Sequence, residues 1–121
     1  MMDERFYELA AQIADWHERT FPDATEESQI LKLNEEFGEY ADGEFIEELA
    51  DVFIVAASLS ERWGNMMGTF TMKAVVKHAG KDADLLMRKI CEKMDVNAAR
   101  NWVKLQDGRY KHIHENPELL K

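Results

Sequence analysis

Apolar residues recur at every third or fourth position along most of the chain, and this period constrains the fold more than any other feature of the sequence. It predicts helices over residues 3–19, from 23 or 25 to 43, over 44–63 and over 82–103, with a shorter helix over 70–77. Asp23, followed three residues later by Glu26, fits a capping pattern for the second helix. An Asp107-Gly108 pair predicts a hairpin turn within residues 104–113, and no pattern supports a larger sheet. We therefore expect an all-α fold, a four-helix bundle with a short C-terminal hairpin or tail.

The composition is that of one folded domain without disulfides. The 121 residues are 45% hydrophobic and 32% charged, and a chain of this length buries enough surface for a bundle without covalent staples, so we expect a single domain over residues 1–121. The one cysteine, Cys91, lacks a disulfide partner and a zinc-ligand pattern, which favours a reducing compartment, the cytoplasm. Neither a signal peptide nor an uncharged run of the ~20 residues that span a bilayer is present, so we expect no secretion and no membrane partner.

The net charge is concentrated in one segment. Residues 26–51 contain ten acidic residues and one basic residue, Lys32, and so carry the whole chain's net charge of −9. A surplus of carboxylates opposes generic binding to a nucleic-acid polymer, because such binding depends on Lys and Arg displacing counterions. Like charges crowded on neighbouring helices must be solvated, paired across the fold or neutralised by bound cations.

The acidic segment contains two pairs of carboxylates at helical spacing. Glu36 and Glu39 are three residues apart, as are Glu48 and Asp51, so each pair shares one helical face. If the two helices fold back at Gly43, Glu39 lies level with Glu48, and Glu36 lies level with Asp51. Helix axes ~8–10 Å apart then allow the four carboxylates to meet around hard divalent cations, Mg²⁺ or Mn²⁺.

A solvated acidic surface is the alternative explanation of this pattern, because acids are common on helix surfaces. Against it, the face that carries Glu48 and Asp51 continues into an apolar stripe that ends at Leu59. Unpaired carboxylates at the end of a buried stripe are costly, and a bound cation removes that cost. A di-iron centre is excluded because the sequence has no Glu-x-x-His pair.

A donor-rich stripe follows on the last predicted helix. Its members recur at three-to-four-residue spacing: Lys89, Lys93, Asn97, Arg100 and Lys104. Charge balance with the acidic segment explains Lys89 and Lys104. Asn97 beside Arg100 suits contact with an anion better, since an amide next to a forked guanidinium matches phosphate oxygens. A carboxylate cage for a metal beside a phosphate clamp indicates phosphoryl chemistry.

Two motifs together resemble the all-α nucleoside triphosphate pyrophosphohydrolases of the MazG-like superfamily, in particular the short phage and prophage type. They are Glu35-Glu36-x-x-Glu39 with Glu48-x-x-Asp51, and Lys93-Met94-x-x-Asn97-x-x-Arg100-x-Trp102. The resemblance implies hydrolysis of a nucleoside triphosphate, a deoxy or non-canonical one, to its monophosphate and pyrophosphate, by a homodimer or a dimer of dimers. It also implies that the metal ligands are Glu36, Glu39, Glu48 and Asp51, that Glu35 orients the attacking water or takes its proton, and that Lys93, Asn97 and Arg100 contact the triphosphate.

Further substrate contacts follow from residue chemistry. A nucleobase needs an aromatic slot, for which His17 and Trp102 are the chosen candidates beside Trp16 and Tyr110. Trp102 lies on a different face of its predicted helix from Arg100, which places it where it could serve a neighbouring subunit. Lys32, one turn before Glu36, is the remaining substrate contact. Residues 65–80 and the C-terminal tail are the candidate subunit contacts.

A non-enzymatic function competes with this interpretation, namely an acidic helical partner such as an antitoxin or a DNA mimic. A mimic needs spread, exposed acids and is indifferent to Mg²⁺. An enzyme gains melting temperature when Mg²⁺ and nucleotide are added, because ligands that bind only the folded state stabilise it. We expect the enzyme, with Mg²⁺ as its cofactor and Mn²⁺ as a substitute.

Overall fold

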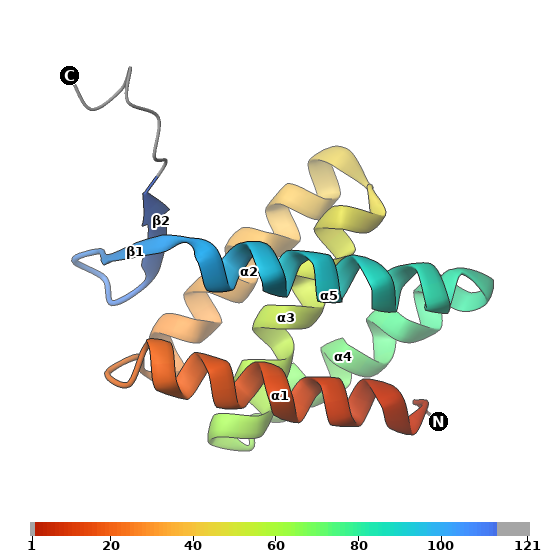
Figure 1. Ribbon diagram of the computed structural model, residues 1–121, viewed down its shortest axis with the longest axis horizontal. Coiled ribbons are helices and arrows are strands. Elements are labelled where there is room, and N and C mark those ends of the chain that lie inside the picture. Colours follow the sequence, from red (N-terminus) through yellow and green to blue (C-terminus); the bar gives the residue numbers. More distant parts are fainter. Residues whose placement is uncertain (1, 114–121) are drawn as a thin grey trace.

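The computed structural model describes residues 2–113, which form five α-helices and a small antiparallel hairpin (Figure 1). The elements are α1 (Glu4–Thr20), α2 (Glu26–Gly43), α3 (Ile46–Trp63), α4 (Met66–Ala79), a 3₁₀ turn (Gly80–Asp82), α5 (Ala83–Ala99), β1 (Asn101–Lys104) and β2 (Tyr110–Ile113). The all-α prediction is confirmed: four helices have 17 or 18 residues, and α4 has 14. Within residues 2–113, no helix is both long enough and apolar enough to cross a membrane.

The central helix is α3, which packs against α1, α2, α4 and α5. In Figure 1 it lies behind α1 and α5 in the middle of the molecule. Every residue from 52 to 59 is buried, and a helix that is buried all round belongs inside a fold. The surrounding helices contribute Phe6, Leu33, Met72 and Ile90 to the same core. This core fixes the first turns of α3, which carry Glu48 and Asp51.

The turn between α2 and α3 is two residues longer than expected. Gly43 ends α2 as predicted, but α3 begins at Ile46 rather than at Glu44. Glu44 takes the left-handed conformation (φ 55°, ψ 27°), and its N–H donates to the Tyr40 carbonyl at 2.6 Å. Gly43 is favoured for a steric reason, because a Cβ at this position would lie 3.0 Å from the Phe45 ring. The strained residue of the turn is therefore Glu44.

The start of α2 differs from the predicted cap. Thr25, not Asp23, caps the helix: its hydroxyl accepts from the Ser28 N–H at 3.0 Å, and the Ser28 hydroxyl accepts from the Thr25 N–H at 3.0 Å. This reciprocal pair satisfies two N–H groups that the helix start leaves unpaired. The carboxylate of Asp23 instead bonds Lys104 and Tyr110 of the hairpin.

Helix α4 covers residues 66–79, so the predicted short helix at 70–77 was too short. The apolar period was hard to read here because Met66 and Phe70 are exposed, while Gly68 is buried against α3. A Cβ on Gly68 would lie only 2.7 Å from the Ala56 carbonyl oxygen. The glycine lets two helix backbones approach closely, which a count of large apolar residues does not detect.

The last helix ends earlier than predicted, at Ala99 rather than at residue 103. Arg100 has an extended backbone (φ −82°, ψ 154°), and Asn101 begins a strand that pairs with Ile113. The aromatic and β-branched residues that follow Arg100 favour a strand when a partner strand is present. The predicted turn is correct, since Gly108 has a positive φ of 90°. Arg100 and Lys104 therefore lie beyond the helix that carries Asn97.

Candidate active site

A pocket of about 530 Å³ lies among α1, α2, α3, α5 and the hairpin. All the site residues predicted from the sequence line it: His17, Lys32, Glu35, Glu36, Glu39, Glu48, Asp51, Lys93, Asn97, Arg100 and Trp102. We call the part formed by Glu36, Glu39, Glu48 and Asp51 the acidic end, and the part formed by Trp16, Phe21, Trp102 and Tyr110 the aromatic end. Gln29 and Glu36, which both line the pocket, are seven positions apart on α2, about 10 Å along the helix axis.

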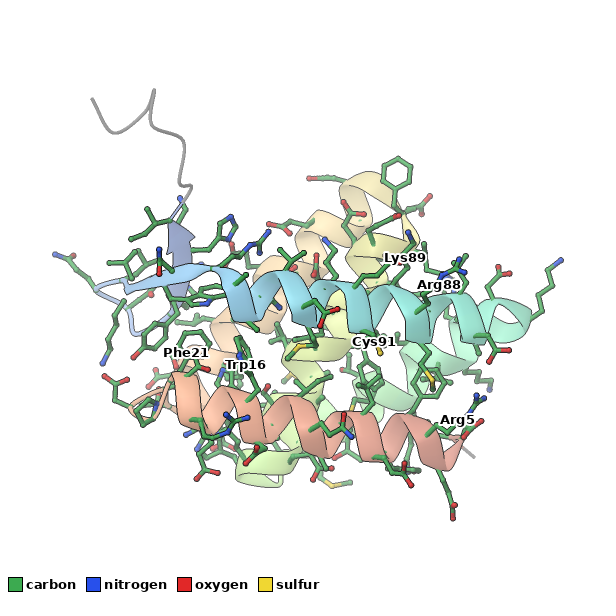
Figure 2. The ribbon with its side chains drawn as sticks, in the orientation of Figure 1. Arg5, Trp16, Phe21, Arg88, Lys89 and Cys91 are labelled. Carbon is green, nitrogen blue, oxygen red and sulfur yellow. The ribbon has the colours of Figure 1, made fainter. Side chains whose placement is uncertain are left out.

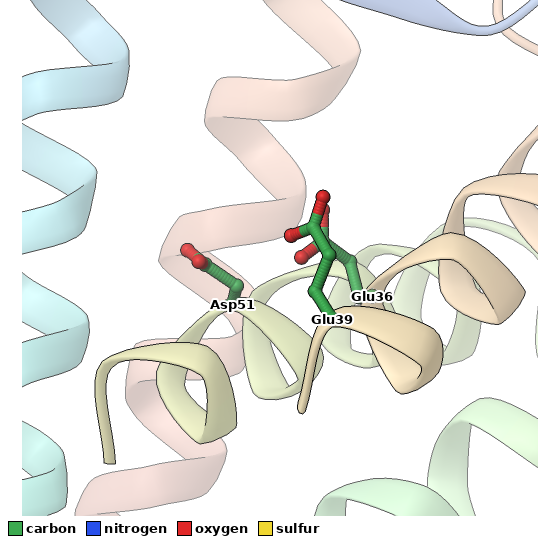
Figure 3. A group of neighbouring side chains, drawn as sticks. All are labelled: Glu36, Glu39 and Asp51. Carbon is green, nitrogen blue, oxygen red and sulfur yellow. The ribbon is translucent and has the colours of Figure 1, made fainter. Parts of the chain in front are cut away.

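Three carboxylates converge at the acidic end. Glu36 and Glu39 project from α2 toward Asp51 on α3 (Figure 3), and one oxygen of each lies within 4.8 Å of the others. Glu36 is buried, Asp51 is half-buried and Glu39 is exposed, so the cluster reaches from the core to the pocket opening. The predicted pairing of Glu36 with Asp51 across the helix hairpin agrees with this geometry.

Glu48, the fourth predicted ligand, lines the same pocket but lies outside this close group of three. It belongs to the first turn of α3, and its Oε1 lies 3.6 Å from the position that a Cβ of Gly43 would take. Its carboxylate therefore approaches the end of α2. The level pairing of Glu39 with Glu48 stays a prediction, and α3 begins at Ile46 rather than at Glu44.

Two carboxylate oxygens at this end are buried and have no hydrogen-bond partner among the described residues, Glu36 Oε2 and Glu48 Oε2. Burial raises the pKa of Glu36 to about 7, and the nearby Asp51 and Glu39 carboxylates add to the increase while Lys32 opposes it. Burial also raises the pKa of Asp51, against the effect of Lys93. The acidic end is thus short of positive charge.

These residues fit a hard divalent cation. Every donor in the cluster is a carboxylate oxygen, the type of ligand that Mg²⁺ and Mn²⁺ prefer. The buried oxygens of Glu36 and Glu48 lack protein donors in the part of the chain that the structure describes, and a cation is the group that would satisfy them.

Basic side chains surround the acids without neutralising them. Lys32 Nζ lies 3.4 Å from Glu36 Oε1, and Lys93 Nζ lies 3.4 Å from Asp51 Oδ2. Arg100 Nη1 donates to the Asn97 side-chain oxygen at 3.2 Å, which leaves the amide hydrogens of Asn97 for a ligand. The pocket therefore offers ammonium, amide and guanidinium donors beside its carboxylates.

Glu35 takes part in a contact that the sequence did not reveal. Arg109, just after the hairpin turn, places Nη1 2.9 Å from Glu35 Oε2, while Lys32 Nζ lies 3.5 Å from the same oxygen. Arg109 lines the pocket and was missed as a site residue, because only the folded hairpin brings it across 74 positions of sequence to α2. The predicted turn at Asp107-Gly108 was the one available signal.

The aromatic end brings together rings from two distant segments, the end of α1 and the C-terminal hairpin. Trp16 and Phe21 lie side by side where α1 ends (Figure 2), with ring centroids 5.4 Å apart. Phe21 also lies 5.2 Å from the ring of Trp102 and 4.3 Å from the ring of Tyr110. Trp102 thus faces the pocket of its own chain, and its indole N–H donates to the Asn97 carbonyl at 3.2 Å.

The two lysines assigned to charge balance do not line the pocket in the described part of the chain. Lys89 Nζ lies 3.5 Å from Glu47 Oε1, and Lys104 Nζ lies 2.9 Å from Asp23 Oδ2. Of the predicted stripe, the structure brings Lys93, Asn97 and Arg100 into the pocket and leaves the outer two on the surface.

An all-α fold that joins a carboxylate cluster, phosphate-type donors and an aromatic slot in one pocket defines a class of nucleotide hydrolases. Residues 9–119 match the dATP/dGTP pyrophosphohydrolase family, and the chain belongs to this family. The family expected from the two sequence motifs is therefore confirmed.

Individual relatives are similar over most of the chain. A dATP/dGTP diphosphohydrolase of Salmonella phage PMBT28 is 29% identical over 103 residues, which cover 84% of this chain and 29% of that protein. The chain thus spans less than a third of this relative. A cyanophage S-2L MazG-like pyrophosphohydrolase, solved with dGDP and three catalytic Mn²⁺ ions per active site, shares 29% identity with a TM-score of 0.45, covering 90% of this chain and 97% of that one.

Proposed function

We propose that this protein hydrolyses a purine deoxynucleoside triphosphate to its monophosphate and pyrophosphate in a Mg²⁺-dependent reaction. The observation that carries the proposal is the cluster of Glu36, Glu39 and Asp51, whose oxygens lie within 4.8 Å of one another beside a pocket with phosphate-type donors and aromatic rings. The family match supports the class of reaction, and the name of the phage relative supports dATP or dGTP as the substrate.

Glu36, Glu39 and Asp51 would hold the cation, with Glu48 as a further ligand from the first turn of α3. When bound, Mg²⁺ supplies charge neutralisation of the triphosphate and a more acidic attacking water. Mn²⁺ takes the same oxygen donors and is expected to substitute.

The other pocket residues have roles that follow from their contacts. Lys93, Asn97 and Arg100 bind phosphate oxygens, and Arg100 stabilises the charge that develops on the leaving pyrophosphate. Glu35, held between Lys32 and Arg109, orients the attacking water and takes its proton. The water oxygen forms a bond to the α-phosphorus while the bond from that phosphorus to the α,β-bridging oxygen breaks. Trp102 and His17 contact the nucleobase.

Release of pyrophosphate from each of the common deoxynucleoside triphosphates, with Mg²⁺ and with EDTA, tests the proposal. The expected result is Mg²⁺-dependent turnover of dATP or dGTP with a monophosphate as the second product. Inorganic phosphate and a diphosphate as products would contradict attack at the α-phosphorus. A protein whose melting temperature is indifferent to Mg²⁺ and nucleotide would favour the competing function as an acidic interaction partner.

We further propose a homodimer or a dimer of dimers as the working assembly. Exposed apolar side chains on α4 support this, since Met66 and Phe70 are 57% and 61% exposed and apolar patches of this kind often mark subunit contacts. The C-terminal tail, the other candidate contact, lies mainly outside the described residues. Light scattering of the purified protein measures the mass directly, and a monomer across micromolar concentrations would contradict the assembly.

A further inference from the structure

The turn of the C-terminal hairpin packs against one face of α2. Gly108, whose φ is 90°, lies over Ser28, because a Cβ on this glycine would be 3.2 Å from the Ser28 Cβ. Ser28, Lys32 and Glu35 follow one another at spacings of four and three residues, so they share this face of the helix. The turn therefore lies against the face of α2 that carries Glu35.

Contacts of the strand that follows hold the turn in this place. The centre of the Tyr110 ring lies 4.3 Å from that of Phe21, and the Tyr110 hydroxyl donates to Asp23. Lys104, which pairs with Tyr110 across the hairpin, places its Nζ 2.9 Å from the same carboxylate. Because the residues on both sides of it are anchored, the main chain of Arg109 is held at a fixed distance from α2.

Asp107 orients the side chain of Arg109. One oxygen of its carboxylate, Oδ1, accepts from the Arg109 main-chain N–H at 3.0 Å. The other oxygen, Oδ2, accepts from Arg109 Nε at 2.8 Å and lies 2.8 Å from Nη2. Because the guanidinium is planar and rigid, a carboxylate bound along one edge fixes the direction of the remaining nitrogen, Nη1.

This remaining nitrogen contacts Glu35. Arg109 Nη1 donates to Glu35 Oε2 at 2.9 Å. The Glu35 side chain is 37% exposed, and a glutamate that is exposed to this extent samples several rotamers unless a contact selects one. The contact with Arg109 makes that selection.

Lys32 constrains Glu35 less than Arg109 does. Its Nζ lies 3.5 Å from Glu35 Oε2 and 3.4 Å from Glu36 Oε1, so two carboxylates share one flexible side chain. An ammonium group is a point charge that sets no direction, whereas the guanidinium held by Asp107 does. Arg109 is therefore the group that orients the Glu35 carboxylate.

We propose that Asp107 and Arg109 are positioning residues for the reaction: Asp107 orients the guanidinium, and the guanidinium holds Glu35 in the rotamer from which it orients the attacking water. The inference rests on the proposed function, in which Glu35 has that role. It makes the hairpin necessary for turnover. Asp107 is not among the described residues that line the pocket, so a loss of turnover in an Asp107 variant would not come from a lost contact with the substrate.

Two measurements on the full chain separate positioning from binding. Release of pyrophosphate gives kcat, and calorimetry gives the Kd of an inert triphosphate analogue in which a methylene group replaces the α,β-bridging oxygen. Arg109→Met and Asp107→Asn should each lower kcat by about tenfold or more, since a small misplacement of a reacting group is costly. The Kd of the analogue should change by less than about threefold, because the effect falls on the transition state.

Further variants separate positioning from charge and from structural support. Arg109→Lys keeps the charge but loses the fork, so kcat should fall in it as well. Asp107→Asn keeps an oxygen for the Arg109 N–H, and so tests the inference even if Arg109→Met fails to fold. In a Glu35→Gln background, Arg109→Met should have no further effect on the residual rate, since the two residues act as one unit. Lys104→Met removes another ion pair of the hairpin, that with Asp23, and is the control, with kcat unchanged.

Four results in an active protein would overturn the inference alone. Full kcat in Asp107→Asn would show that the guanidinium needs no orientation. An equal loss of kcat in Lys104→Met and Arg109→Met would mean that the hairpin is only structural. A weaker analogue with unchanged kcat in Arg109→Met would show that Arg109 binds phosphate instead. The same fractional loss from Arg109→Met with and without Glu35→Gln would show that Arg109 acts independently of Glu35. A wild-type protein that releases no pyrophosphate would contradict the proposed function, and this inference with it.

Discussion

The two ends of the pocket are built in opposite ways. The acidic end comes from two consecutive helices, and its close group of carboxylates spans residues 36–51. The aromatic end joins the end of α1 to a hairpin more than 80 residues later in the chain. The acidic end contains buried oxygens without protein donors among the described residues, at Glu36 and Glu48, whereas the buried polar groups of the aromatic end are tied to one another and to the main chain.

This difference predicts that substitutions at the two ends will affect different properties of the protein. The acidic end carries excess negative charge that a bound cation would neutralise. Substitutions there should therefore affect ligand binding and turnover more than the stability of the fold. The aromatic end is already satisfied in the free protein, so its substitutions should affect the stability of the fold as well. Variants at the two ends should therefore differ in kind as well as in size.

The largest expected effect comes from removing a charge at the acidic end. Glu39→Gln and Asp51→Asn should each lower Mg²⁺-dependent pyrophosphate release by ~100-fold or more, since even the loss of an outer partner of a metal site costs 10- to 100-fold. The helical content should stay nearly unchanged, and the metal-free proteins should melt at the same or a higher temperature because a repulsive charge is gone. Steady-state assays and thermal melts measure the two quantities.

Glu47→Gln is the matched control for these variants. Glu47 lies on α3 four residues before Asp51 but pairs with Lys89 on the surface, so its loss should change activity less than about twofold. Full activity in Glu39→Gln or Asp51→Asn, or an equal loss in Glu47→Gln, would contradict the assignment of the acidic end as the cation site.

The next largest effect is expected when a hydrogen-bond donor of the pocket, Arg100, is removed. Arg100→Ala should cost about 2–4 kcal/mol of transition-state stabilisation, the scale of losing one preorganised donor at a developing charge. Mg²⁺ binding should persist, because Arg100 lies beyond α5, whereas the carboxylate cluster lies on α2 and α3. Steady-state kinetics measures the effect on turnover and on triphosphate affinity. Calorimetry measures whether Mg²⁺ affinity is unchanged.

Lys104→Ala is the control for Arg100. Lys104 pairs with Asp23 on the surface, so its removal should be near neutral for activity. Equal losses in the two variants would indicate that general charge balance, rather than contact with phosphate, explains the basic stripe.

The acidic end could be predicted from the sequence because helical geometry is local. A three-residue spacing fixes which carboxylates share a face, and a short turn fixes which faces meet. The one difference there, the later start of α3, comes from two turn residues: Glu44 is left-handed and Phe45 is extended. The spacing of apolar residues in the sequence does not reveal the backbone conformation of such a turn.

The aromatic end could be predicted only as a set of residue types. His17 and Trp102 were named, but nothing local to either residue indicates that the chain brings them together with Phe21. The sequence predicted that Trp102 lies in a helix that continues to residue 103. In the structure Trp102 lies in a strand, because pairing with β2 overrides the local preference for a helix. Gln29, Arg62 and Arg109 were missed because their partners are 26, 45 and 74 positions away.

The pH dependence of stability tests whether the aromatic end is satisfied in the free protein. Burial, with help from Arg62 and against the bond to Gln29, lowers the pKa of His17 to about 4 from 6.5. Between these values the unfolded chain binds more protons than the folded one, so the free energy of unfolding falls as the pH is lowered. The loss should amount to about 2–3 kcal/mol between pH 7 and pH 4.5.

His17→Gln isolates this contribution. A glutamine amide can accept from Arg62 but does not titrate, so the wild-type protein should lose about 2–3 kcal/mol more than the variant over the same interval. Urea denaturation at the two pH values measures the difference, in which the titration of the carboxylates common to both proteins cancels. Parallel curves for the two proteins would show that His17 does not stay neutral in the folded state.

The smallest expected effect tests whether the turn beside the acidic end is strained independently of the site. Glu44 has a φ of 55°, a conformation that costs a residue with a Cβ about 1–2 kcal/mol and costs glycine almost nothing. Glu44→Gly should therefore stabilise the protein by about 0.5–1 kcal/mol, after the greater flexibility of glycine in the unfolded chain is subtracted. The same change three residues later, Glu47→Gly, falls inside α3 and should destabilise by about 1 kcal/mol. Opposite shifts in the urea midpoint, with pyrophosphate release unchanged in Glu44→Gly, would show that the turn sets the start of α3 without tuning the carboxylates. A loss of activity in Glu44→Gly at unchanged or higher stability would show instead that the rigid left-handed residue holds Glu48 in place, and that the acidic end depends on its turn as much as on its helices.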